Sequence, residues 1–330
     1  MILAGDIGGT HTRLAFFDVA NSQLRPVALS VFTSREFKGL DEIATAFVND
    51  SNLRPDAACF GVAGPVRDGR VETPNLPWII ESERLARELH LSEVTLINDL
   101  EANAWGIATL KANDVVSLNP LTPTVAGNQA VISAGTGLGE AGMYWDGEQF
   151  HILASEGGHA DFAPRTELET ELLRYLAARY GHVSYERVVS GPGLVNIFDF
   201  LRDTQRGTEP EWLAQEMRSD PAAAIAQAAM EGRCALCEQA LDTFISLYAA
   251  EAGNLALKLM ATGGVYLGGG IAPKVLSKLT GPLFMQSFVS KGRLQPLLES
   301  IPVKVIVNDK TALMGAARCA LATQDSRHVL

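Results

Sequence analysis

The chain has 330 residues, of which 47% are hydrophobic and 20% are charged, which is the composition of a globular protein large enough for two domains. Its formal net charge of −11 argues against a nucleic-acid-binding protein, because such proteins normally present a basic face. The sequence shows no run of about 18 apolar residues and no basic leader, so we expect a cytoplasmic protein without a membrane-spanning segment.

Strand and helix patterns alternate through residues 1–110. Such alternation predicts an α/β sheet with helices on its faces. Apolar runs that end at glycine or polar residues predict strands at 2–7, 13–19, 27–32, 57–63 and 94–97. Helical spacing of the apolar residues predicts helices at 40–48, 81–89 and 99–110.

The rest of the chain opens with a second strand-rich stretch, residues 129–150, and is then mainly helical from residue 167 to residue 260. Helix starts are marked at Ser190, before Gly-Pro-Gly, and at Asp220, before a proline. Further strands are predicted at 265–267 and 303–307, followed by a helix at 311–322. The whole pattern is that of the α/β class.

Cys234 and Cys237 have the spacing of half a zinc site. No second pair of ligands lies near them in the sequence, and they fall in a stretch with helical character. We therefore expect two buried helical thiols rather than a metal site.

The chain makes one strand–turn–strand pattern twice. The first turn is Asp6-Ile7-Gly8-Gly9-Thr10 and the second is Gly135-Thr136-Gly137. Glycine lets backbone N–H groups approach an anion closely, and threonine adds a hydroxyl donor, so the pair of turns suggests a phosphate site. Each turn alone is as consistent with a hairpin that binds nothing. Neither is a Walker A loop, because no lysine is present.

Asp6 ends the first strand and could hold a divalent metal ion directly or through water, or could bond the N–H groups of its own turn. A third glycine cluster, Gly268-Gly269-Gly270, ends the strand at 265–267. With Pro273 close behind, it predicts a turn into a helix, which could form a wall of a nucleotide site or a plain connection.

Polar side chains that could bind a small hydroxylated ligand stand at three places. Asn98 and Asp99 end a strand, where open α/β sheets place ligands, and a carboxylate there can accept a proton from an alcohol during phosphoryl transfer. The alternative is that Asp99 caps the next helix, and the spacing by itself favours this alternative. Glu156, His159 and Glu186 could also bind hydroxyl groups, although such residues more often have structural or surface roles.

In this order, the motifs resemble those of the bacterial glucokinase family, within the hexokinase–actin ATPase superfamily. The similarity covers nearly the whole chain, and so many ordered motifs are far more specific than one glycine turn. The motifs are GDIGGTHTRLA at 5–15, AGPV at 63–66, NLPW at 75–78, INDLEA at 97–102, AGTGLG at 134–139, EGGHADFAP at 156–164, ERVVSGPGL at 186–194, LGGGIAP at 267–273 and FVSKGR at 288–293. In one departure, His11 stands where the family usually has asparagine.

The resemblance implies transfer of phosphate from ATP to the 6-hydroxyl of D-glucose, with Mg²⁺ and with Asp99 as the general base. It implies Asn98, Asp99, Glu156, His159 and Glu186 as glucose ligands. The implied nucleotide-binding residues are Asp6, Ile7, Gly8, Gly9, Thr10, His11, Gly135, Thr136, Gly137, Gly269 and Gly270.

The family fold implies two lobes of the hexokinase/actin-like type with a ligand cleft between them. The small α/β lobe would be residues 1–110, joined by the C-terminal helix 303–330, and the large α+β lobe would be residues 111–302. A homodimer acting in glycolysis, with no nucleic-acid or membrane partner, is also implied. The alternatives are a kinase for another hexose or an amino sugar, a sugar sensor without turnover, and an ATPase that acts on water.

Overall fold

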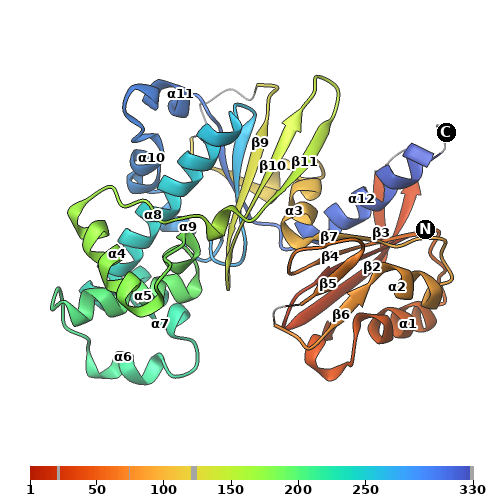
Figure 1. The fold of residues 1–330 in the computed structure, drawn as a ribbon, viewed down its shortest axis with the longest axis horizontal. Coiled ribbons are helices and arrows are strands. Elements are labelled where there is room, and N and C mark those ends of the chain that lie inside the picture. The colour runs from red at the N-terminus through yellow and green to blue at the C-terminus, as the bar shows by residue number, and fades with distance from the viewer. Residues whose placement is uncertain (21–22, 74, 120–124, 328–330) are drawn as a thin grey trace. The chain divides into compact units, whose positions relative to one another are not determined.

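The structure is a computed structural model that describes residues 1–20, 23–73, 75–119 and 125–327. The chain divides into two compact units (Figure 1). Unit 1 comprises Met1–Lys111 and Asn308–Leu330, and unit 2 comprises Ala112–Val307. The C-terminal segment is shared between them, because the strand Val303–Ile306 pairs within unit 2 and the helix Thr311–Arg327 belongs to unit 1.

Unit 1 is built on a sheet with the strand order β3-β2-β1-β4-β7. β1, β2 and β3 are antiparallel neighbours, and β4 and β7 run parallel to β1. The strands are β1 (Ile2–Ile7), β2 (His11–Ala20), β3 (Gln23–Thr33), β4 (Ala57–Val62) and β7 (Thr95–Asn98), with β5 (Arg70–Glu72) and β6 (Ile79–Glu81) paired separately. The helices are α1 (Leu40–Ser51), α2 (Ser82–Glu88), α3 (Asp99–Ile107) and α12 (Thr311–Arg327), with a 3₁₀ turn η1 (Ser34–Glu36).

Alternate residues of β1 pack against different helices, as expected for a strand that is buried on both faces. Leu3 and Ile7 share a core cluster with α1 and α2, whereas Ile2 and Ala4 share one with α3 and α12. Figure 1 shows these helix pairs on the two faces of the sheet. Helices α3 and α12 cross closely at Gly315. A Cβ at this position would lie only 2.8 Å from the carbonyl carbon of Ala102. This crossing fixes α3 where it follows β7.

Unit 2 contains a sheet with the strand order β11-β10-β9-β12-β13-β8. Its strands are β8 (Val115–Ser117), β9 (Gln129–Ala134), β10 (Leu138–Trp145), β11 (Phe150–Ser155), β12 (Gly264–Gly268) and β13 (Val303–Ile306). Its helices are α4 (Glu167–Tyr180), α5 (Gly191–Asp203), α6 (Glu211–Glu216), α7 (Pro221–Met230), α8 (Ala235–Leu259), α9 (Leu276–Leu279), α10 (Pro282–Val289) and α11 (Gln295–Glu299). The 3₁₀ turns are η2 (Ala112–Asp114), η3 (Gly157–His159), η4 (Tyr185–Arg187) and η5 (Gly292–Leu294).

The two sheets share one topology. In each, an antiparallel series (β1-β2-β3 or β9-β10-β11) is extended beside its first strand by parallel strands (β4 and β7, or β12 and β13). The sequence predicted this repeat from its two strand–turn–strand patterns, and the strand pairing confirms it. Each glycine turn therefore occupies the equivalent position in its own sheet.

Helix α8 forms the centre of the unit 2 core. It is long and largely buried, and the hydroxyl of Tyr248 donates to the carbonyls of Ile132 (3.1 Å) and Gly268 (3.4 Å). These bonds tie α8 to the sheet next to the second and third glycine turns. No helix in the described part of the chain is long and apolar enough to cross a membrane.

Several local predictions are confirmed. The side chains of Ser190 and Asp220 accept backbone N–H bonds (3.0 and 3.1 Å) and cap α5 and α7. Cys234 and Cys237 are buried free thiols, as predicted. Cys234 is the N-cap of α8, because its sulfur accepts the N–H of Cys237 at 3.4 Å.

The prediction of a helix with Pro273 near its start is wrong. Residues 269–275 form turns in which the N–H groups of Lys274 (2.9 Å) and Val275 (3.2 Å) bond back to the carbonyl of Ile271. Helix α9 begins only at Leu276. The third glycine cluster therefore leads into a compact turn rather than a helix N-terminus.

Candidate functional site

The first glycine turn, at the end of β1, is held in place by hydrogen bonds. Gly8 donates its N–H to the carbonyl of His11 (2.9 Å), which closes the hairpin between β1 and β2. The buried Ser34 supports the turn: its hydroxyl donates to the carbonyl of Gly8 (2.8 Å) and its N–H donates to the carbonyl of Thr10 (2.9 Å). These bonds hold the turn in one conformation before any ligand binds, as a phosphate-binding hairpin requires. Sequence reasoning missed Ser34, since it lies far from the turn in the chain.

Asp6 and Arg13 face each other across the same hairpin. Nη1 of Arg13 lies 3.5 Å from Oδ2 of Asp6 and donates to the carbonyl of Asp309 at 3.0 Å. Burial raises the pKa of Asp6, and the neighbouring Arg13 opposes that rise. The Asp6 carboxylate is therefore engaged in an ion pair within unit 1.

Asn98, and not Asp99, caps helix α3. Oδ1 of Asn98 accepts the N–H of Leu100 (2.8 Å), and Glu101 accepts the N–H of Asn98 (2.8 Å), so the pair forms a capping box. Nδ2 of Asn98 also donates to the carbonyl of Gly64 at 3.0 Å. The interpretation of Asp99 as the cap is wrong. Asp99 is the first residue of α3 and is half-buried, and one of its carboxylate oxygens lies 3.0 Å from the N–H of Leu100.

The unit 1 candidates share one edge of the sheet. The strand register aligns Ile7, Val62 and Asn98, which are the last residues of β1, β4 and β7. The first glycine turn and the Asn98–Asp99 pair therefore emerge together at the carboxyl ends of parallel strands. This is the edge at which open α/β sheets bind ligands.

The second glycine turn is joined directly to Glu186. Within the turn, Gly135 donates its N–H to the carbonyl of Gly137 (2.9 Å). Oε2 of Glu186 accepts the N–H of Leu138, the first residue of β10, at 3.0 Å. A Cβ on Gly137 would lie 2.5 Å from this same oxygen, so the glycine leaves the space that the carboxylate fills.

The loop that follows β11 is anchored to the segment before Glu186. Phe162 donates its N–H to the carbonyl of Val183, and Tyr185 donates its N–H to the carbonyl of Ala160, both at 3.0 Å. The rings of Phe162 and Tyr185 pack edge to face, with centroids 5.6 Å apart. These contacts hold η3 against η4 and so bring two sequence motifs together.

His159 and Glu186 meet at this junction, with Nδ1 of His159 4.0 Å from Oε1 of Glu186. His159 is exposed and Glu186 is partly exposed, so both can reach a ligand. Glu156 is also exposed, and its carboxylate makes no hydrogen bond or ion pair with any residue that the structure describes. The structure thus brings the unit 2 sugar candidates to one loop cluster beside the second glycine turn.

A cavity of about 750 Å³ opens next to the second glycine turn within unit 2, which is an ordinary size for a small-molecule site. It is lined by Gly135, Thr136 and Gly270, all predicted from the sequence as nucleotide-binding residues. The start of α5 lies beside the turn, since Gly191 donates its N–H to the carbonyl of Gly135 at 2.8 Å. The partial positive charge of that helix end, together with the exposed Lys274 in the lining, suits an anionic group.

Tyr180 and Asn196, which also line the cavity, were missed by sequence reasoning. Tyr180 of α4 donates its hydroxyl to Oδ1 of Asn196 of α5 (2.9 Å), and the guanidinium of Arg187 lies 4.2 Å from the centre of the Tyr180 ring. No local pattern links these residues, because they come from different elements. The available signal was the pair of marked helix starts at Ser190 and Asp220, since the first residues of α5 and α7 line the cavity.

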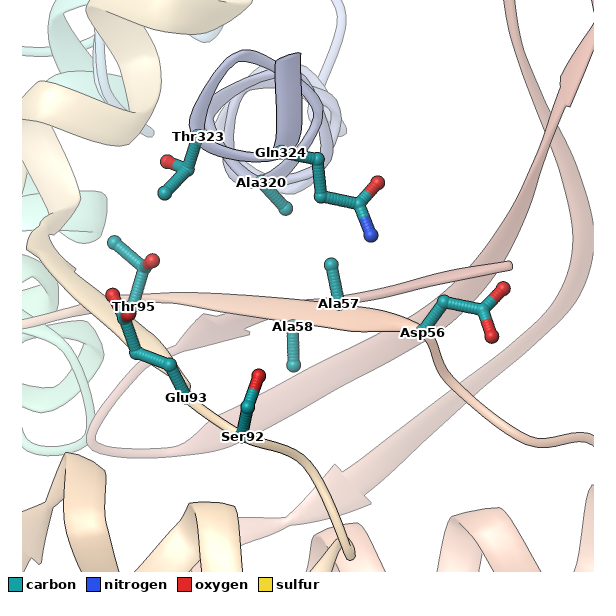
Figure 2. A pocket seen from close by; sticks show the side chains of 9 residues that line it. All are labelled: Asp56, Ala57, Ala58, Ser92, Glu93, Thr95, Ala320, Thr323 and Gln324. Atoms are coloured by element: carbon teal, nitrogen blue, oxygen red, sulfur yellow. The ribbon is translucent and has the colours of Figure 1, made fainter. Parts of the chain in front are cut away.

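A second cavity, of about 190 Å³, lies in unit 1. Figure 2 shows Ala57 of β4 pointing toward Ala320 and Gln324 of α12. Ala57 and Thr95 are the first residues of β4 and β7, so this cavity lies at the amino ends of the strands. It contains none of the predicted residues, and we exclude it from the candidate site.

The comparisons with known proteins fit this geometry. The model of the glucokinase family matches residues 3–323 of the chain. A glucokinase of Nostoc sp. is 44% identical over 337 residues, which covers 97% of this chain and 98% of that protein.

The chain belongs to the glucokinase family. The crystal structure of a glucokinase from an Antarctic psychrotroph has 32% identity and a TM-score of 0.85, with 97% of this chain and 98% of that chain covered. A more distant structure, described as a ROK family glucokinase from Streptomyces griseus in complex with glucose and AMPPNP, has 20% identity and a TM-score of 0.66, with 97% and 99% covered. These structures confirm the predicted fold class. As a glucokinase-family enzyme, the protein is a kinase that phosphorylates a sugar, which disfavours both the sensor and the ATPase interpretations.

The described residues of this glucokinase-family chain do not by themselves form a metal site. Among the described residues, no group of three or more His, Cys, Asp or Glu side chains could hold a metal ion. The carboxylate of Asp6 is paired with Arg13. Such a donor set fits Mg²⁺ that is held mainly by phosphate oxygens and water.

Proposed function

We propose that the protein transfers the γ-phosphoryl group of ATP to the 6-hydroxyl of D-glucose and so produces glucose 6-phosphate. The observation that carries this proposal is the position of Glu186. One of its oxygens accepts the N–H of Leu138 behind the second glycine turn (3.0 Å), and the other lies 4.0 Å from His159. A hydroxyl group bound by Glu186 and His159 would therefore lie beside a phosphate bound by that turn.

ATP would occupy the 750 Å³ cavity of unit 2. We place its phosphates at Gly135, Thr136 and Lys274, where N–H donors and positive charge gather, and its adenosine toward Tyr180. We also propose Gly137, Gly269 and residues 6–11 of the first turn as nucleotide-binding residues. The AMPPNP complex of the Streptomyces griseus relative supports a nucleotide in this fold.

Glucose would be bound by carboxylates and amides that accept and donate in pairs. We propose Glu156, His159 and Glu186 as glucose ligands, and likewise Asn98 and Asp99. Asn98 keeps one N–H and one lone pair beyond its cap and Gly64 bonds, so it can still bind a hydroxyl group.

Asp99 would accept the proton of the 6-hydroxyl while that oxygen attacks phosphorus in line with the leaving group. Because Asn98 and Glu101 satisfy the start of α3, the cap does not depend on the Asp99 side chain. The N–H groups of the glycine turns would stabilise the charge that spreads over the transferring phosphoryl group. Mg²⁺, when bound, would neutralise part of the phosphate charge.

A coupled assay over a sugar panel, with ATP and Mg²⁺, tests the proposal. We expect glucose to give the highest kcat/KM. A higher value for another hexose or an amino sugar would reassign the substrate, and ATP turnover that is independent of every sugar would overturn the kinase proposal.

We also propose, from the family resemblance alone, that the protein is a cytoplasmic homodimer that acts in glycolysis. Sedimentation velocity at micromolar concentration tests the dimer, and a single species at the mass of one chain would contradict it.

A further inference from the structure

A cluster of buried charged and polar groups lies behind the sugar loop, residues 155–159. Glu140 on β10 and Glu251 on α8 are almost completely buried, with exposed fractions of 1% and 0%. Carboxyl groups are rarely buried to this extent unless they are paired. The proposed mechanism uses neither of them, so their burial needs another explanation.

Glu140 is in contact with the sugar loop. The strand register places Glu140 directly opposite Ser155, the last residue of β11. A Cβ on Gly157 would lie 2.9 Å from Cδ of Glu140 and would collide with its Oε2. The carboxyl group of Glu140 therefore fills the space below the residue that separates Glu156 from Gly158.

The other end of the cluster reaches η4. Glu251 accepts from Nδ2 of Asn254 (2.7 Å) and from Nζ of Lys258 (3.3 Å). Nδ2 of Asn254 also donates to the hydroxyl of Tyr185 (3.0 Å), which precedes Glu186 in the chain. Lys291 donates to Oδ1 of Asn254 and, at 2.9 Å, to the carbonyl of Ala250. Glu251 is thus connected through Asn254 to the segment that carries Glu186.

One carboxyl oxygen of Glu140 lacks a hydrogen-bond partner among the described residues, and a proton would allow this carboxyl group to donate. Its Oε1 is buried and has no partner among the described residues. Two ionised carboxyl groups can only accept, so a hydrogen bond between Glu140 and Glu251 requires a proton on one of them. Burial, followed by the charge of Glu251, raises the pKa of Glu140 to about 8, against the opposing effect of Lys258.

We propose that Glu140 is a positioning residue for sugar binding, which in its protonated form donates to Glu251 and holds the loop that carries Glu156 and His159. This inference rests on the proposed assignment of these two side chains as sugar ligands. Ionisation of Glu140 would put a second negative charge beside Glu251 and push the two carboxylates apart, and the contact with Gly157 would pass that displacement to the loop.

Other groups around the pair also bear on this titration. Lys258 and Glu251 come from α8, Tyr185 comes from η4, and Lys291 follows α10. Burial lowers the pKa of Lys291 to about 8. The charges of Arg165, just before α4, and of Glu169, in its first turn, also affect that pKa. A substitution of Glu140 leaves Lys291 unchanged. Comparing the pH profiles of that variant and the wild type therefore separates the titration of Glu140 from that of Lys291.

Glu140→Gln supplies a neutral side chain of the same shape that can still donate to Glu251. In the wild type, KM for glucose should rise about fivefold between about pH 7 and pH 9.5, while KM for ATP changes less than about twofold. In Glu140→Gln, KM for glucose at about pH 7 should stay within twofold of the wild type, and most of the rise should be lost. Glu148→Gln, an exposed residue of the same hairpin, should behave as the wild type.

A double-mutant cycle tests the contact itself. Gly157→Ala should raise KM for glucose about tenfold, and combining it with Glu140→Ala should give less than the product of the two single effects, because the smaller side chain makes room. Additive effects, or a pH profile of Glu140→Gln that equals the wild type, would overturn the proposal.

Carboxyl-detected ¹³C NMR gives a readout that does not depend on activity. We expect a glutamate resonance that titrates near pH 8 in the wild type and is absent from Glu140→Gln. If no such resonance titrates above about pH 7, the protonated state is refuted even in an active enzyme. If it is present and no sugar is phosphorylated, the proposed function fails while the protonated pair stands.

Discussion

Replacing Glu186 separates its contact with the glycine turn from its proposed contact with the sugar. Glutamine keeps a neutral acceptor for the N–H of Leu138, which lies 3.0 Å from the carboxylate, but removes the negative charge. A hydrogen bond to a charged group contributes about 1.5–3 kcal/mol and a neutral one about 0.5–1.5 kcal/mol, so the expected loss is about 1–1.5 kcal/mol. KM for glucose in Glu186→Gln should therefore rise about 5–10-fold, with KM for ATP within about twofold.

Glu186→Ala removes both contacts. The N–H of the buried residue Leu138 then loses its acceptor, which costs about 1–3 kcal/mol, and the second glycine turn loosens. We expect KM for ATP to rise about tenfold and kcat/KM for both substrates to fall about 10²–10³-fold. A coupled assay with each substrate varied in turn measures these values, with the exposed Glu167→Ala as the matched control. The reasoning fails if Glu186→Gln raises both KM values equally, or if Glu186→Ala leaves KM for ATP unchanged.

Asp99→Asn should lower kcat at least about 10²-fold in a folded protein, as expected for the loss of a general base, whereas the exposed Asp18→Asn should not; near-normal turnover would remove Asp99 from that role. Gly315→Ala should destabilise the protein by about 3 kcal/mol in thermal or urea unfolding, because its Cβ would collide with the carbonyl of Ala102, and an unchanged midpoint would contradict the close crossing of α3 and α12. The raised pKa of Glu140 means that its folded form binds a proton that its unfolded form has lost between about pH 4.5 and pH 8. Urea unfolding should therefore show the stability of the wild type, relative to Glu140→Gln, falling by roughly 3 kcal/mol from pH 5 to pH 8 and levelling above that; a constant difference would contradict it.

Local signals made much of the fold predictable. The caps at Ser190 and Asp220 and both glycine hairpins depend on residues close in the sequence, and the structure has them where they were predicted. The cap of α3 was also readable, because Asn98 and Glu101 have the spacing of a capping box. Choosing Asp99 as the cap overlooked that reciprocal bond.

The features that could not be predicted depend on contacts distant in the sequence. The bond between Tyr180 and Asn196 in the cavity lining joins different helices, and Ser34, which supports the first turn, follows the end of β3. Glu140 begins a run of consecutive buried residues in β10, so no alternation of polar and apolar residues marks its environment. Its proposed partner Glu251, on α8, lies more than a hundred residues later in the chain.

Unit 1 is not continuous in the chain, because the whole of unit 2 separates Met1–Lys111 from α12. During synthesis, Ile2, Ala4 and Phe17 therefore leave the ribosome long before Ala316 and Ala320 of α12, which share their core. At about 5–20 residues per second, the roughly 200 intervening residues take about 10–40 s to make. For that time a nascent chain carries an apolar sheet face that α12 has not yet covered, while unit 2 can complete its own core. The slow and aggregation-sensitive step of maturation should therefore be the docking of α12, which is made only after the whole of unit 2.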